Sequence, residues 1–273
     1  MVTFGQLLLV GVGLIGYGAA AVAAFTRFRQ PARGGAAVVT APLVAGLVAG
    51  GGLITWRIAA AGSLLGVGGF DATILIAWLI AVEVLVIRSA GRLGGTDAFL
   101  LPVAAVVQAC SLLMIRSGAS GPSYSHQWHI IGHAVIISVA GACFVASGVA
   151  GGIYLIVHRA MRSKHQLGVL GRLPPLESLE GFGRWMVAAG FPLLTFGILT
   201  GVCGIAHAPQ ADRSREIMLG SGTIVLWALY AIAMLVVWLR PRFRGPRAAT
   251  LATGAAGLAV VNFVTYLLMR SHI

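Results

Sequence analysis

The chain has 273 residues, of which 58% are hydrophobic and only 10% are charged, and its mean hydropathy is +0.93. A water-soluble domain carries about 25% charged residues, so this composition excludes a soluble globular enzyme. Arg and Lys outnumber Asp and Glu by 19 to 7, which gives a net charge of +12. In so apolar a chain this charge indicates membrane orientation and contact with anionic lipid, and it gives no support for nucleic-acid binding.

Eight apolar segments each approach the length of about 20 residues that a membrane-spanning helix needs. They lie at residues 3–25, 36–56, 70–87, 97–115, 129–157, 181–206, 217–239 and 248–269. Lipid leaves the backbone of such segments helical, and none alternates apolar and polar residues as a strand does. We therefore predict an all-α integral membrane protein, a bundle of about eight transmembrane helices that forms a single polytopic membrane domain over residues 1–273. In the longest connection, 158–180, we expect a short surface helix ending at LPPLESLE.

The basic residues orient this bundle. With the N-terminus outside, fourteen of the 19 Arg and Lys residues fall on the inner side and five on the outer side. Inner loops of membrane proteins carry such an excess, so we predict that the N- and C-termini both lie on the outer (periplasmic or extracellular) side. The opening MVTFGQLLLV has no basic residue before its apolar run, so we expect a retained first helix and not a cleaved signal peptide.

Three of the seven histidines lie in the short stretch YSHQWHIIGH, at the outer end of the fifth segment. His126, His129 and His133 are three, four and seven positions apart, so on one helix they share a face. Two His at this spacing are able to bind one metal ion from the same side. The alternative is that they are interfacial histidines beside Trp128 in an aromatic belt. His133 lies deepest, where an ionisable side chain points most strongly to function.

One helix face cannot supply both axial ligands of a haem, because these approach the ring from opposite sides. A haem at this end would need a second His from another helix. His207 is the natural candidate because it follows GVCGIA at the outer end of the sixth segment. His272, next to the last residue, is a weaker one. His129 is then either an alternate ligand to His133 or a residue that holds a propionate.

Charged residues within or beside the apolar segments are the other candidates. Glu83 lies deep in the third segment, where a carboxylate costs about 2.5–3.5 kcal/mol unless it is paired, protonated or wet. It has either a functional role or a polar partner on a neighbouring helix. Arg57 and Arg116 lie at outer ends of segments, where they either hold an anion such as a propionate or act as interfacial anchors.

Small residues are abundant in the segments. The three cysteines form no CxxC or CxxCH motif, so we expect them to act as small apolar residues. Several glycines recur at four-residue spacing, which allows close helix packing or, alternatively, room for a flat cofactor. These pairs are Gly46 and Gly50, Gly148 and Gly152, and Gly197 and Gly201.

Three blocks of residues 126–269 resemble, in order, the cytochrome c assembly protein family, in particular its shorter HemX/CcsA-like branch. The blocks are HAVIISVAGACFVASGVAGGIYLIVHRAM, LPPLESLEGFGRWMVAAGFPLLTFGILTGV and WALYAIAMLVVWLRPRFRGPRAA. The resemblance implies an inner (plasma) membrane protein of bacterial type that carries haem to the outer face and presents it to apocytochrome c, with a ResB-like partner. It implies that His133 is a haem ligand, whereas His207 rests on geometry alone.

The chain departs from the family's longer members. It lacks their tryptophan-rich WWD segment, since the loop RSGASGPSYSHQW holds one Trp. The main hypothesis is a haem-handling cytochrome c assembly protein that binds haem b, transiently or permanently, through His133 and His207. The alternatives are a haem-b electron-transfer subunit of a membrane redox complex and a non-haem scaffold or regulatory subunit. No hydrolase or nucleotide-binding motif occurs, so we expect a binding or assembly component and not a conventional enzyme.

Overall fold

The computed structural model describes residues 3–30, 35–61, 69–91, 93–115, 128–162, 172–206, 210–239 and 245–271, with only the backbone course at some helix ends. All regular secondary structure in these ranges is helical. The eight helices are α1 (Phe4–Arg29), α2 (Ala37–Ala61), α3 (Gly69–Ala90), α4 (Asp97–Leu113), α5 (Trp128–Arg162), α6 (Leu176–Ala206), α7 (Gln210–Leu239) and α8 (Pro246–Ser271).

Each predicted apolar segment coincides with one helix, so the prediction of an all-helical membrane protein is confirmed. Within the described ranges six helices are long and apolar enough to cross a membrane, and two shorter apolar stretches lie at Asp97–Leu113 and Gly220–Leu235. The expected surface helix in the connection 158–180 lies partly outside the described residues, because 163–171 are not among them, and the LESLE of LPPLESLE forms the first turns of α6. Leu176 begins α6 itself, since Pro175 accepts the first hydrogen bonds of the helix from the amides of Ser178 and Leu179. A proline is tolerated there because it precedes the helical hydrogen-bond ladder.

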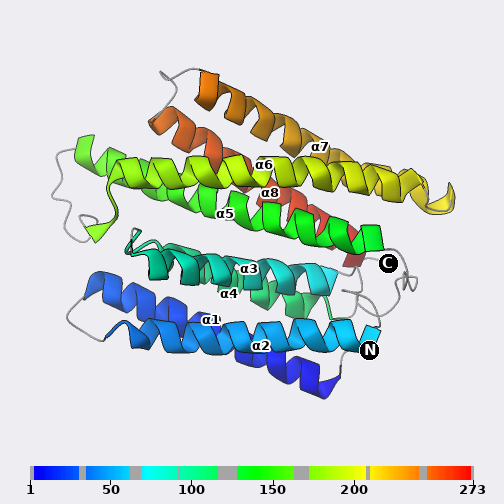
Figure 1. The fold of residues 1–273 in the computed structure, drawn as a ribbon, viewed down its shortest axis with the longest axis horizontal. Coiled ribbons are helices and arrows are strands. Elements are labelled where there is room, and N and C mark those ends of the chain that lie inside the picture. Colours follow the sequence, from blue (N-terminus) through cyan, green and yellow to red (C-terminus); the bar gives the residue numbers. More distant parts are fainter. Residues whose placement is uncertain are drawn as a thin grey trace.

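The helices form two groups of four, α1–α4 and α5–α8, which Figure 1 shows as the lower and upper layers of the bundle. In the first group α1 packs against α2 and α4, and α3 packs against α4. In the second group α5 packs against α6 and α8, and α7 packs against α6 and α8. The two groups meet mainly where α3 contacts α5. The first residues of α1 and the last of α8 lie at the same end of the bundle (Figure 1).

Small residues let the helices approach closely, as lipid-embedded packing requires. The Tyr17 ring of α1 lies on Gly46 of α2, and the Trp78 indole of α3 lies on Gly50 and donates a hydrogen bond of 3.0 Å to the Leu47 carbonyl. Gly148 of α5 packs against α8, whereas a side chain at Gly152 would meet nothing within 4 Å. The glycine spacing therefore marks helix contacts at most of the predicted positions.

Candidate functional site

His133 lies in the second turn of α5 and packs against α6. On α6, Gly197 and Gly201 are four residues apart and leave a shallow groove where α5 crosses. Ile137 occupies the groove at Gly197, and the His133 imidazole occupies it at Gly201, where an added Cβ would lie 2.9 Å from the ring carbon Cε1. The small-xxx-small spacing predicted from the sequence thus seats this histidine, and no flat cofactor is needed to explain these two glycines.

Hydrogen bonds fix the orientation of the His133 ring. Its Nδ1 lies 2.7 Å from the carbonyl oxygen of Gly197 and 3.3 Å from the Thr200 hydroxyl oxygen. A carbonyl oxygen only accepts, so Nδ1 carries the proton and donates it. Thr200 belongs to the same small network, because its hydroxyl lies 2.9 Å from the Gly197 carbonyl. The neutral ring therefore has its lone pair on Nε2.

This tautomer is the one that a metal-bound histidine adopts. Metal-ligating histidines usually donate the second ring nitrogen to a carbonyl or carboxylate, which orients the ring and raises its basicity. The Gly197 carbonyl supplies that partner to His133. The ring of His133 is thus held in the tautomer in which Nε2 is the nitrogen able to ligate a metal. Among the described residues no group of three or more His, Cys, Asp or Glu converges on one point, so within those ranges this is not a multidentate metal-ion site.

The other predicted histidines are placed only in part. The backbone of α5 puts His129 one turn before His133, on the same side of the helix. His207, His126 and His272 lie outside the described residues. His207 follows Ala206, the last residue of α6, and is thus six positions beyond the glycine that seats His133. His158, at the far end of α5, stacks on Tyr154 with 5.8 Å between ring centroids.

Glu83 lies at the junction of the two groups of helices. The Cys143 thiol of α5 lies near its carboxyl group, while its Oε2 atom has no hydrogen-bond partner among the described residues. A buried thiol from the other group of helices is therefore a neighbour of this intramembrane acid. Cys143 is a free, buried cysteine in the core, as expected of a small apolar residue, and the sequence does not reveal that it lies near Glu83.

Arg57 is not available to hold a propionate, which was one of its two predicted roles. Its guanidinium forms an ion pair with Asp71 of α3, with 2.9 Å between Nη2 and Oδ2, and it lies over the Phe70 ring. Asp71 is only 3% exposed, so this pair ties α2 to α3. Arg116 lies outside the described residues.

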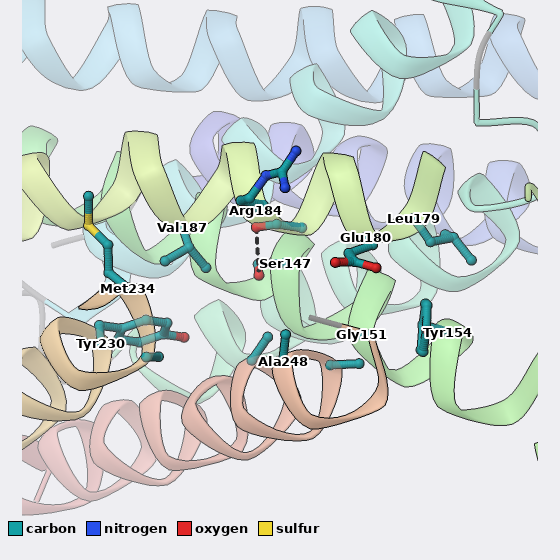
Figure 2. A pocket seen from close by; sticks show the side chains of 15 residues that line it. Ser147, Gly151, Tyr154, Leu179, Glu180, Arg184, Val187, Tyr230, Met234 and Ala248 are labelled. Carbon is teal, nitrogen blue, oxygen red and sulfur yellow. Dashed lines mark hydrogen bonds between the residues drawn. The ribbon is translucent and has the colours of Figure 1, made fainter. Parts of the chain in front are cut away.

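The sequence did not indicate a narrow cavity of about 50 Å³ among α5, α6, α7 and α8, away from His133. Figure 2 shows its walls, with the Ser147 hydroxyl donating to the Gly183 carbonyl at 3.1 Å. The Tyr230 hydroxyl points into this cavity and has no protein partner among the described residues. Tyr230 is stacked on Phe144 at 3.6 Å. The cavity has room for ordered water, and no feature of the sequence pattern marks it.

Comparison with known proteins gives one distant relative. The chain is 25% identical over 115 residues to the protein HemX of Brevibacillus brevis. The match covers 42% of this chain and 40% of HemX, so the chain spans less than half of that relative's length. No family model matches the chain. No solved structure matches it.

Proposed function

We propose that this chain is a multi-pass membrane protein of the cytochrome c assembly type that holds haem near the outer face, with His133 as an iron ligand. The observation that carries the proposal is the hydrogen bond from His133 Nδ1 to the Gly197 carbonyl, 2.7 Å long. It sets the lone pair on Nε2, as iron ligation requires. The similarity to HemX and the family resemblance of residues 126–269 support a haem-related role.

Each residue at the His133 site has a separate role in the proposed function. His133 would hold the iron through Nε2, Gly197 and Thr200 hold the ring in one tautomer, and Gly201 leaves room for it. Haem would supply a redox-active iron to which histidine nitrogens bind. His207 is our candidate for the second ligand, because the same α6 that seats His133 leads directly into it. His129 is the alternate, or it contacts a propionate.

The proposal includes a topology and partners. All eight helices cross the membrane, with both termini on the outer side of a bacterial inner membrane, since the Arg-bearing turns then lie inside. His133 and His207 are then at the outer end. Haem held there would be passed to apocytochrome c in concert with a ResB-like or other membrane partner.

The test is spectroscopic. We would purify the wild type, His133→Ala and His158→Ala in mild detergent from haem-replete cells, and record reduced-minus-oxidised spectra with pyridine haemochrome quantitation. We expect a haem b signal in the wild type that is lost in His133→Ala and kept in His158→Ala. His158 is the matched control because it lies on the same helix and stacks on Tyr154 at its far end.

The outcomes separate the alternatives. Substoichiometric haem that exchanges with added apoprotein fits an assembly role. A stable haem near one per chain that is reversibly reduced favours the electron-transfer subunit. A colourless, folded wild type contradicts the proposal and leaves the scaffold hypothesis. A haem signal that survives His133→Ala unchanged contradicts the assignment of His133 as an iron ligand.

A further inference from the structure

A second candidate site lies at the opposite end of the bundle from His133. Here the end of α1, the start of α2, the α3–α4 turn and the segment before α6 surround a cavity of about 630 Å³. Three arginines line it: Arg27 from α1, Arg88 from α3 and Arg172 from the segment before α6. The carboxylate of Asp97 is the one acidic side chain among its described walls.

Two of the arginines are fixed by bonds to the protein. Arg88 forms an ion pair with Asp97, and its Nη2 lies 3.2 Å from both the Ala36 carbonyl oxygen and the Thr40 hydroxyl oxygen. Arg172 donates from Nη1 to the carbonyls of Phe28 and Arg29, at 3.0 and 2.6 Å. These bonds hold both guanidinium groups in place before any ligand arrives, which reduces the entropic cost of binding.

The charges around the cavity do not balance. Asp97 compensates Arg88, whereas Arg172 contacts only carbonyl groups. Arg27 is half-buried and has no hydrogen-bond or ion-pair partner among the described residues. The buried Nε of Arg88 also has no partner within those ranges. Two arginines without a carboxylate partner among the described residues, Arg27 and Arg172, therefore line the same cavity.

Three glycines of the α3–α4 turn line the cavity with backbone alone. Gly91 and Gly95 have φ values of 66° and 90°, which favour glycine. A side chain added at Gly91 or Gly94 would meet nothing within 4 Å. These glycines thus border the cavity without filling it, and the apolar side chains of Phe28 and Ile87 form part of the wall.

We propose that this cavity binds a phosphate-bearing anion, either the head group of an anionic phospholipid or free inorganic phosphate. Guanidinium groups match phosphate oxygens with paired, charge-assisted hydrogen bonds. Basic pockets at the ends of membrane-spanning helices suit lipid head groups, and the apolar wall suits the adjoining glycerol and acyl carbons. The site does not depend on haem.

The first experiment measures lipid retention. We would reconstitute the full chain in nanodiscs of equal parts phosphatidylglycerol and phosphatidylcholine, and count retained lipids by native mass spectrometry. Arg27→Gln is expected to lower phosphatidylglycerol retention about five-fold to ten-fold. Arg162→Gln is the matched control, because Arg162 is an exposed arginine at the end of α5 that does not line the cavity.

A second pair of variants tests the charge of the site without removing an arginine. Ala36 lines the cavity and is exposed, so Ala36→Glu would place a carboxylate among the guanidinium groups, whereas Ala36→Gln adds the same bulk without charge. We expect Ala36→Glu to abolish retention and Ala36→Gln to keep it.

Inorganic phosphate distinguishes the source of the ligand. A lipid preference that follows these variants assigns the site to a head group. No lipid preference, with a rise of melting temperature in millimolar phosphate that Arg27→Gln removes and Arg162→Gln keeps, assigns it to free phosphate. The proposal is overturned if neither probe binds, or if Arg162→Gln weakens binding as much as Arg27→Gln does.

Discussion

In α1–α4 four charged side chains form two ion pairs, whereas in α5–α8 a histidine bonds to helix backbone and a tyrosine hydroxyl faces a cavity. Both ion pairs found among the described residues, Arg57 with Asp71 and Arg88 with Asp97, lie in the first group. In the second group His133 bonds to the Gly197 carbonyl, and Tyr230 faces the cavity of Figure 2. The first half is thus held together by two ion pairs, and the second half contains the His133–Gly197 hydrogen bond on which the proposed function rests.

This difference gives each half a distinct sensitivity to substitution. Loss of a partner in the first half leaves a charge uncompensated near or within the membrane. Loss of His133 in the second half removes its hydrogen bond to the Gly197 carbonyl and, under the proposed function, lowers haem binding. The following predictions test that contrast, and they run from the largest expected effect to the smallest.

Removing Asp71 should be the most damaging change. Asp71→Ala leaves the Arg57 guanidinium without its carboxylate, and breaking a buried pair in this way costs about 3–5 kcal/mol in free energy of unfolding. Denaturant titration in mild detergent measures the loss. The double variant Arg57→Ala with Asp71→Ala should be less destabilised than the sum of the singles. A loss below about 1 kcal/mol in Asp71→Ala would show that the pair is solvated like a surface salt bridge.

Gly201→Ala should displace the His133 imidazole. The new methyl would lie 2.9 Å from Cε1 of the ring, and such overpacking costs about 1–3 kcal/mol. We expect both the haem content per chain and the free energy of unfolding to fall. Gly152→Ala is the matched control, since a methyl there meets nothing within 4 Å. Equal haem content in the two variants would mean that the groove on α6 does not position His133.

Cys143→Ala tests the contact between α3 and α5, where the two groups of helices meet. The change removes the buried thiol that lies near the Glu83 carboxyl group, and a buried polar group without a partner costs about 1–3 kcal/mol. Cys110→Ala controls for the loss of a thiol from a neighbouring part of the bundle. If both variants lose the same stability, the Glu83–Cys143 contact contributes nothing beyond packing.

The smallest expected effects on stability are those of Tyr17→Phe in the first half and Tyr230→Phe in the second half. The hydroxyl groups of Tyr17 and Tyr230 both lack a protein partner among the described residues. Tyr17 lies against Gly46 and Gly50, so Tyr17→Phe should stabilise by about 1 kcal/mol because it removes an unsatisfied group. Tyr230 faces a cavity of about 50 Å³, where water is able to bind its hydroxyl, so Tyr230→Phe should be neutral. Equal gains in melting temperature would argue for a dry cavity.

The C-terminal end of α5 and the N-terminal end of α6 show what hydropathy alone is able to predict. The fifth segment was predicted to end at 157 and the sixth to begin at 181, yet α5 continues to Arg162 and α6 begins at Leu176. Hydropathy falls where Arg159 and Glu177 appear, but the hydrogen bonds of a helix need no apolar side chain. Apolar length therefore predicts where a helix enters lipid, and capping groups decide where it stops.

The sequence by itself determined eight helices and the chemical candidates His133 and Glu83, because lipid demands satisfied backbone groups and makes intramembrane ionisable residues rare. Only the tertiary structure decided their partners. Gly197 lies 64 positions from His133, and Cys143 and Asp71 likewise meet Glu83 and Arg57 across helices. These helices are apolar on nearly all sides, so the sequence pattern does not reveal which face meets which neighbour. Close packing of small residues sets those faces, and the packing exists only when the bundle is assembled.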